Sequence, residues 1–445
     1  MIFSILRRIA PIMFVLFLSG CVASKRHAES GSLQTLDTKV IAETRPAAVP
    51  PPLTPPPPVT SPVAIPEVSV STASSPDTVV EPIEQPEEKT IIRIGLLQTK
   101  TPVNVSATFG TLVYQATVGS KMLSAKEGSK LRIKLSSRKI IIGKHQFPHG
   151  VWFFPEDDQV LKVNGRRYRG KIWIRPNHKG KMDVIEELPI EEYLYGVVPR
   201  EASASWPAEM LKAQAIISRT YLIANRGRYS SRGFDLSSDV SSQVYGGLES
   251  EKPETTSAVD KTRGQILLDE DNHPVETFFH AACGGRTEEP RYVWSRSSAV
   301  CPYLQSVEDS YCAINPHQHW VFTLTRESLR LKLRRAGYKM GTIQKIRIDH
   351  YTPSGRALII DVSAGDHVFH IPANKFRLSV GADLMRSTWL TGISYAKKRF
   401  RFEGQGWGHG VGLCQWGAKG RAEAGQLYPE ILSAYYPGTH LSHIP

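Results

Sequence analysis

Large aromatic residues are missing from residues 22–90, although they make up 9% of the whole sequence. Proline is abundant there instead, with thirteen of the 31 prolines between Pro46 and Pro86. A segment of this composition buries too little apolar surface to offset the entropy that ordering costs. We therefore expect residues 21–90 to be a disordered linker, which reaches about 200 Å when extended at about 3 Å per residue.

The N-terminus lacks a hydrophobic run long enough to cross a bilayer comfortably. The apolar run Ile9–Leu18 is short and follows two arginines, which is the pattern of a signal peptide. The sequence Leu18-Ser19-Gly20-Cys21 then resembles a bacterial lipobox. We expect residues 1–20 to be a lipoprotein signal peptide and Cys21 to be lipidated, which would anchor the protein to a bacterial membrane outside the cytoplasm.

Cysteine is scarce, and beyond Cys21 there are Cys283, Cys301, Cys312 and Cys414. Outside the cytoplasm disulfides are the default, and Cys301 and Cys312 are close enough in sequence to be bridged easily. A zinc site of His280, Cys283, Cys301 and Cys312 is the competing prediction, although the spacing is not a strict zinc pattern. Neither the disulfide nor a structural zinc would be catalytic, and no cofactor is required.

Acidic residues are fewer than basic ones, and the chain has a formal net charge of +13. Residues 22–90 carry five Lys or Arg and nine Asp or Glu, so residues 91–445 hold a net +15. A basic folded region on an acidic linker indicates a polyanionic partner. An exported protein rarely meets nucleic acid, so we expect cell-wall glycan with its carboxylate-bearing peptides and exclude nucleic acid.

The hydrophobic patterns predict an α+β fold. Strand-like segments separated by glycines fill residues 91–174 and predict a largely antiparallel β region. A helix begins near Pro207 and reaches Asn225, with Met210, Ile217, Tyr221 and Ala224 forming a buried stripe. We expect a β-rich N-terminal part, a central helix that would be the catalytic one if Glu201 just before it is an active-site acid, and a smaller inserted subdomain.

Shorter elements follow the same patterns. Pro189 indicates a helix start at Ile190. Residues 262–268 and 274–281 predict a pair of strands around a turn at Asp269–His273. A basic amphipathic helix is expected at 327–338, followed by strands at 343–351 and 357–365.

Glu201 lies in the irregular segment expected just before the central helix. Lys212 and Arg219 are two helical turns apart and share a face. A carboxylate held near two cations is one arrangement of an active site, and an ordinary solvated acid is the alternative.

Two further segments carry polar candidates. Asp239, Gln243 and Tyr245 stand in a polar loop, where turn residues are the alternative. Six glycines occur in Gly404–Ala418, which indicates backbone that passes close to a ligand or to packed chain, but the spacing is not that of a nucleotide-binding loop. His409, Gln415 and Trp416 in this segment are candidates for contacting a sugar, and a buried core histidine is the alternative for His409.

Several long motifs occur in a specific order. The stretch ELPIEEYLYGVVPREASASWPAEMLKAQAIISRTYLIA resembles the signature of the stage II sporulation protein D / LytB (amidase enhancer) family. The match continues through SSDVSSQVYGG, FFHAACGGRTEEPRYVW, GQGWGHGVGLCQWGA and ILSAYYPGT, and covers roughly residues 90–440. We therefore expect residues 91–445 to be one domain of this family.

The resemblance implies a function. Sporulation members are lytic transglycosylases that cleave glycan strands stripped of their peptides, and Glu201 aligns with their catalytic glutamate. Substrate-binding roles follow for Lys212, Arg219, Gln243, Tyr245, His409 and Gln415. Ala202-Ser203 stands where the family often has Met-Pro.

Other members of the family imply a different activity. LytB-type members imply a non-catalytic enhancer of an N-acetylmuramoyl-L-alanine amidase as the alternative. A structural lipoprotein that links the membrane to the wall is a third hypothesis. Some members of the family carry a metal near the FH…CGG motif.

Overall fold

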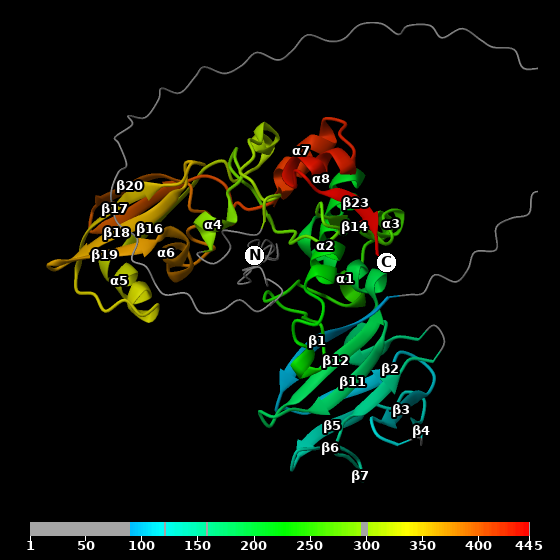
Figure 1. Cartoon of the computed structure of the whole chain (residues 1–445). Helices are drawn as coiled ribbons and strands as arrows, with labels where there is room; N and C mark the ends of the chain where they lie inside the picture. The colour runs from blue at the N-terminus through cyan, green and yellow to red at the C-terminus, as the bar shows by residue number, and fades with distance from the viewer. Residues whose placement is uncertain (1–89, 120–121, 157–158, 295–300, 445) are drawn as a thin grey trace, which may run out of the picture. The chain divides into compact units, whose positions relative to one another are not determined.

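The computed structural model describes residues 90–119, 122–156, 159–294 and 301–444 (Figure 1). The predicted signal peptide, the lipidation site Cys21 and almost all of the predicted linker lie outside these ranges. No helix within them is both long and apolar enough to cross a membrane.

The N-terminal region is built from two sheets that are largely antiparallel, as predicted, while the short strand β13 pairs in parallel with β1. Alternate residues are buried in several of these strands; in β1 these are Ile92 and Ile94, and in β2 they are Val103 and Val105. One sheet has the order β13-β1-β12-β11-β8-β3-β4, and the other β10-β9-β2-β5-β6-β7. Their bounds are β1 Ile91–Thr99, β2 Val103–Ala107, β3 Leu112–Ala116, β4 Met122–Ala125, β5 Leu131–Ser136, β6 Lys139–Ile142, β7 His145–Phe147, β8 Val151–Phe154, β9 Leu161–Val163, β10 Arg166–Tyr168, β11 Lys171–Pro176, β12 Met182–Pro189 and β13 Leu236–Ser237.

Strand β12 leads directly into the helices. Helix α1 (Ile190–Glu201) starts after Pro189, as predicted, and α2 (Ala208–Ala224) is the central helix. Helix α3 is Pro253–Lys261, and short 3₁₀ turns lie at η1 (Ser230–Arg232) and η2 (Leu248–Ser250). The predicted stripe of α2 is buried at Met210, Ile217 and Tyr221.

Glu201 does not lie in irregular chain, contrary to the expectation. It is the last residue of α1, which continues through Pro199. The helix ends within one turn of that proline, and the Ala202 N–H still bonds to the Val198 carbonyl. Proline removes one amide donor but leaves the following turn able to close, so the helix reaches Glu201 before it stops.

Two short strands pair with partners that the sequence did not predict. Strand β14 (Gln265–Leu268) pairs with β23 (His440–His443), and β15 (Phe279–His280) pairs in parallel with β22 (Leu413–Cys414). The turn at Asp269–His273 is present, but only one bridge, Leu268 to Pro274, joins its two sides. Helices α4 (Pro290–Val293), α7 (Gln415–Glu423) and α8 (Tyr428–Tyr435) and the 3₁₀ turn η3 (Ser310–Ile314) complete this part.

The predicted inserted subdomain has a hydrophobic cluster of its own. It contains two three-stranded sheets, β16-β21-β20 and β17-β18-β19, with two helices. Residues 315–412 carry a net charge of +10. The bounds are β16 Trp320–Thr325, α5 Arg326–Arg335, β17 Ile343–Tyr351, β18 Ala357–Ala364, β19 His367–Pro372, α6 Ala373–Val380, β20 Leu390–Ala396 and β21 Arg399–Gly404.

One turn in this subdomain has unusual backbone. Strands β20 and β21 pair from Ala396 and Arg399 outward, so Lys397 and Lys398 alone make the turn. Their φ angles are 50° and 63°, and both residues are exposed. Positive φ at both central residues is the geometry in which Asn-Gly is favoured.

Candidate functional site

Glu201 is a half-buried acid at the end of α1. Its Oε1 atom is buried and has no hydrogen-bond partner among the described residues. Burial raises the pKa of Glu201 to about 7, while a hydrogen bond from the Val244 backbone and the charge of Arg200 oppose this shift. A carboxyl group with this pKa exchanges its proton near neutral pH.

The two predicted cations are bound to other carboxylates. Lys212 Nζ lies 2.6 Å from Glu209 Oε1. Arg219 is fully buried and binds Glu191 through two contacts, at 2.9 and 2.6 Å. Glu201 is therefore spared the strong lowering of pKa that a paired cation would cause.

Arg219 also donates to the backbone carbonyls of Gln265 and Val259. These contacts join α2 to α1, α3 and β14, so the guanidinium acts inside the fold in this structure. A contact between Arg219 and substrate stays a prediction, and the geometry does not favour it.

A buried polar network connects Glu201 with α2 and with the Gly-rich segment. Gln415 Nε2 donates to the Glu201 carbonyl oxygen at 2.9 Å and to Gln214 Oε1 at 3.1 Å. Gln243 Nε2 donates to the Ser218 carbonyl at 3.2 Å, and Gln243 Oε1 accepts from Tyr193 Oη at 3.4 Å. Gln415 and Gln243, both predicted to bind substrate, are buried and hold backbone in place.

Tyr245 is buried beside a second unusual acid. It hydrogen-bonds Glu186, and its ring lies 5.0 Å from that of Tyr193. Burial raises the pKa of Glu186 to about 8. A Cβ on Gly196 would overlap the Tyr245 ring, so α1 needs glycine at this close approach. Substrate binding by Tyr245 stays a prediction.

His409 has the environment of a core histidine. It is buried, and its Nδ1 accepts from the Val411 N–H at 3.0 Å. Its ring centroid lies 5.6 Å from that of His280 and 5.1 Å from that of Trp294. Burial lowers the pKa of His409 to about 3, so the ring is neutral. A role in binding substrate stays a prediction.

The surface beside this network carries two half-buried tryptophans, Trp206 and Trp416, with ring centroids 5.2 Å apart. Trp206 follows the Glu201 turn, and Trp416 follows Gln415. Aromatic faces of this kind are suited to packing on sugar rings.

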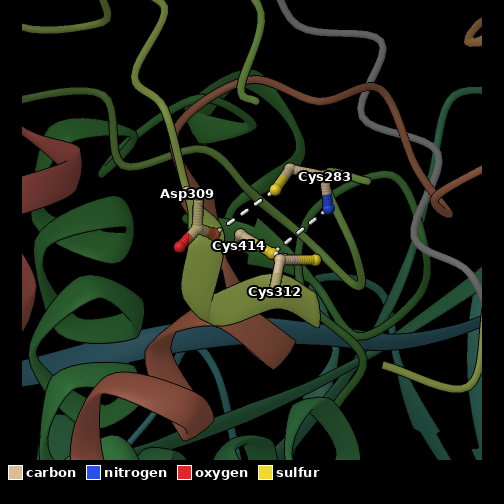
Figure 2. A group of neighbouring side chains, drawn as sticks. All are labelled: Cys283, Asp309, Cys312 and Cys414. Carbon is tan, nitrogen blue, oxygen red and sulfur yellow. Dashed lines mark hydrogen bonds between the residues drawn. The ribbon is translucent and has the colours of Figure 1, made fainter. Parts of the chain in front are cut away.

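The predicted metal ligands do not come together as a set. Cys283 and Cys312 do lie in one buried group, but its other members are Asp309 and Cys414 (Figure 2). His280 Nδ1 bonds instead to the Val411 carbonyl, and Cys301 lies near Tyr303 Oη. No disulfide joins Cys301 to Cys312. Proximity in sequence favoured Cys301, whereas the fold brings Cys414 to the group from 102 residues beyond Cys312.

Sequence reasoning missed several residues of the site. Gln214 and Ser218 stand on α2 among apolar neighbours, and Glu191 is a buried acid in the first turn of α1. A polar side chain inside an apolar stripe was the available signal for Gln214. Val244, which bonds Glu201 through its backbone, left no signal because any residue except proline offers that donor.

Comparison with known proteins gives the context of this site. Residues 178–268 match the family described as Stage II sporulation protein, and residues 315–412 match a domain of unknown function. An uncharacterized protein of Brachyspira hyodysenteriae is 32% identical over 359 residues, covering 79% of this chain and 92% of that protein. The amidase enhancer of Bacillus subtilis is 30% identical over 297 residues, but the match spans only 40% of its length. Stage II sporulation protein D of the same organism is 28% identical over 286 residues, or 78% of its length.

Proposed function

Since the chain belongs to the stage II sporulation protein D / LytB family and has a cell-wall related role, we propose that it is a lytic transglycosylase. Its substrate would be peptidoglycan glycan strands freed of their peptides. Its products would end in 1,6-anhydro-N-acetylmuramic acid.

The observation that carries this proposal is the state of Glu201. The carboxyl group has a buried oxygen without a partner among the described residues, and its pKa is raised to about 7. Acids with a structural role are usually paired. Glu191 on α1 is paired with Arg219, and Glu209 on α2 is paired with Lys212. An acid that is kept unpaired and close to half-protonated at neutral pH suits general acid–base catalysis.

One such acid is sufficient for this reaction. Glycosidases generally use two carboxyl groups, one to protonate the leaving oxygen and one to attack or to activate water. In a lytic transglycosylase the C6 hydroxyl of the substrate itself attacks the anomeric carbon. Glu201 would donate its proton to the glycosidic oxygen as that bond breaks, and then accept the C6 hydroxyl proton as the anhydro ring closes.

Asp239 is the other acid of the active-site motifs, and its environment differs. It is exposed and receives hydrogen bonds from Ser237 and Ser241. Burial alone would raise the pKa of Asp239, but these bonds outweigh it and lower the pKa. A carboxylate of this kind does not serve as a proton donor at neutral pH.

Other features support binding to the wall. Trp206 and Trp416 offer ring faces next to the Glu201 turn, and residues 91–445 carry a net +15 that favours a polyanionic partner. We propose that the protein works outside the cytoplasm and is held to a membrane by lipid on Cys21, with the linker giving it reach.

Product analysis tests this function. Purified denuded glycan is incubated with the protein, and the released fragments are identified by mass spectrometry. Fragments with anhydro ends are expected from wild type and not from Glu201→Gln, while Asp239→Asn keeps most of the activity. Ordinary reducing ends would contradict the single-acid mechanism and point to a water-activating second acid.

The second candidate function is an enhancer of a cell-wall amidase, which the 30% identity to an amidase enhancer favours. An enhancer would release no anhydro ends. It would accelerate a purified N-acetylmuramoyl-L-alanine amidase on intact wall, and Glu201→Gln would leave this acceleration unchanged.

A further inference from the structure

Three cysteines and one aspartate meet in the interior from three separate segments of the chain (Figure 2). Cys283 follows β15, Asp309 directly precedes the η3 turn that contains Cys312, and Cys414 precedes α7. One ligand-capable atom from each lies within 4.8 Å of all the others. All four residues are buried.

The spacing of these atoms matches the edges of a small tetrahedron. The Sγ atoms of Cys312 and Cys414 are 3.5 Å apart, and Cys283 Sγ is 3.3 Å from Asp309 Oδ2. Ligands of a tetrahedral zinc ion with Zn–S bonds of about 2.3 Å are separated by roughly 3.8 Å. A modest outward shift of the side chains would therefore admit the ion.

Each sulfur receives at least one N–H hydrogen bond, as metal-bound thiolates do. Gly285 N–H donates to Cys283 Sγ at 3.3 Å, and Gly417 N–H donates to Cys414 Sγ at 3.3 Å. Asn315 Nδ2 donates to Cys312 Sγ at 3.1 Å. These donors would stabilise the thiolate form of each sulfur.

The carboxylate is also oriented toward the group. Tyr435 Oη donates to Asp309 Oδ2 at 2.8 Å, while the buried Oδ1 has no hydrogen-bond partner among the described residues. A Cβ on Gly417 would overlap both Asp309 Oδ2 and Tyr435 Oη. Glycine at this position is therefore needed for Asp309 to reach the sulfurs.

Two arginines, the buried Arg356 and the partly buried Arg421, balance the charge that an occupied site would carry. Three thiolates and one carboxylate around a divalent ion leave a net charge of −2. Arg421 Nε lies 3.8 Å from Asp309 Oδ1, and Arg356 donates to the Cys283 carbonyl through Nη2. Arg356 is fully buried, and its Nε and Nη1 have no hydrogen-bond partner among the described residues.

We propose that Cys283, Cys312, Cys414 and Asp309 form a structural zinc site. Soft thiolate ligands select zinc over calcium or magnesium, and four protein ligands leave no open position for catalysis. A disulfide would account for only part of this group. It would use two of the three sulfurs and would leave a buried thiol and the carboxylate without a function. The metal would join three segments: the chain after β15, the η3 turn and the start of α7. Gln415 directly follows Cys414, and its side chain bonds the Glu201 carbonyl.

The metal content of the full-length protein tests this proposal without measuring glycan cleavage. Elemental analysis of protein purified from zinc-supplemented cells should give about one zinc per chain. After exchange with cobalt, the spectrum should contain sulfur-to-cobalt charge-transfer bands of a tetrahedral thiolate site. Removal of the metal by a chelator should lower the unfolding temperature.

Variants identify the ligands. Cys414→Ser and Asp309→Ala should lower zinc affinity about tenfold or more. Asp309→Cys should retain zinc, because four thiolates make a complete site. Cys301→Ser is the matched control and should keep both the metal and the cobalt spectrum.

The cobalt spectrum of wild type tests the zinc site even if a cysteine variant fails to fold. Protein with negligible zinc, no cobalt–thiolate bands and a Cys312–Cys414 disulfide in non-reduced peptides would overturn the proposal. Loss of zinc in Cys301→Ser with retention in Cys414→Ser would assign the metal to another set of ligands and would also overturn it.

Discussion

The side chain of Gln415 donates a hydrogen bond to the backbone carbonyl of Glu201 at 2.9 Å, between residues 214 positions apart in the sequence. The same Nε2 atom donates to Gln214 on α2. The Gly-rich segment thereby fixes the end of α1, where the proposed catalytic acid stands. Gln415 is a positioning residue in this arrangement, since it acts on the backbone of Glu201 and not on its carboxyl group.

Replacing Gln415 by alanine should separate positioning from binding. The Glu201 backbone would lose one restraint, and small displacements of a catalytic group cost up to about 10²-fold in rate. We expect Gln415→Ala to lower kcat about 10- to 100-fold with little change in KM, measured on denuded glycan. Gln426→Ala, a change in the loop after α7, serves as control. An increase in KM at unchanged kcat would instead assign Gln415 to substrate binding.

Glu201→Gln should alter stability with a definite pH dependence. The folded pKa of about 7 exceeds the ordinary value of 4.5, so the stability that Glu201 contributes is present below about pH 4.5 and is lost as pH rises through about 7. Glutamine does not ionise. Urea unfolding should show Glu201→Gln more stable than wild type at pH 8, by on the order of 1–3 kcal/mol, and nearly equal at pH 4.5.

Glu209→Gln is the opposite case and serves as the control for that measurement. Burial alone would raise the pKa of Glu209, but hydrogen bonds from Lys212 and the Tyr428 N–H outweigh it and lower the pKa. Its stability contribution is present above the unfolded value of 4.5 and is lost as pH falls through the lower folded pKa. Glu209→Gln should therefore be destabilising at pH 8. A shared sign for the two variants would contradict the assigned environments.

Arg219→Met should mainly affect folding. It would leave the Glu191 carboxylate buried without its cation, which costs about 3–5 kcal/mol. Adding Glu191→Gln should recover much of this loss, as measured by urea unfolding. Arg263→Ala, which removes the exposed partner of Asp260, should cost no more than about 1 kcal/mol. Full stability with weakened glycan binding in Arg219→Met would instead support the predicted contact with substrate.

Anchoring by Cys21 is tested in cells. Cys21→Ala should abolish labelling with a fatty-acid analogue and move the protein from the membrane fraction to the soluble fraction. Cys301→Ser should leave labelling unchanged. Labelling that persists in Cys21→Ala would rule out this residue as the lipid anchor.

The sequence predicted those parts of the fold that depend on local pattern. Strand β17 occupies the residues 343–351 that its pattern indicated, and α2 buries Met210, Ile217 and Tyr221 as its spacing required. Alternation and helical periodicity arise from one element facing one core, so a single segment is enough to detect them.

Pairings between segments that are distant in the sequence could not be predicted from local patterns. Strand β14 pairs with β23 near the end of the chain, and Arg219 pairs with Glu191 on another helix. Nothing local distinguishes these partners from nearer ones, and nearness in sequence wrongly favoured Cys301 over Cys414 as a neighbour of Cys312. The site could be predicted at Glu201 by resemblance, whereas its buried supports depend on contacts that only the fold creates.

The turn of Lys397 and Lys398 has a consequence for engineering the stability of the protein. Left-handed backbone costs a non-glycine residue about 1 kcal/mol or more, and Asn-Gly would remove most of that cost at both positions. Replacing the two lysines by Asn-Gly should therefore raise the melting temperature. Two of the positive charges in residues 315–412 stand on these lysines, so the more stable turn would lower the net charge of that subdomain from +10 to +8.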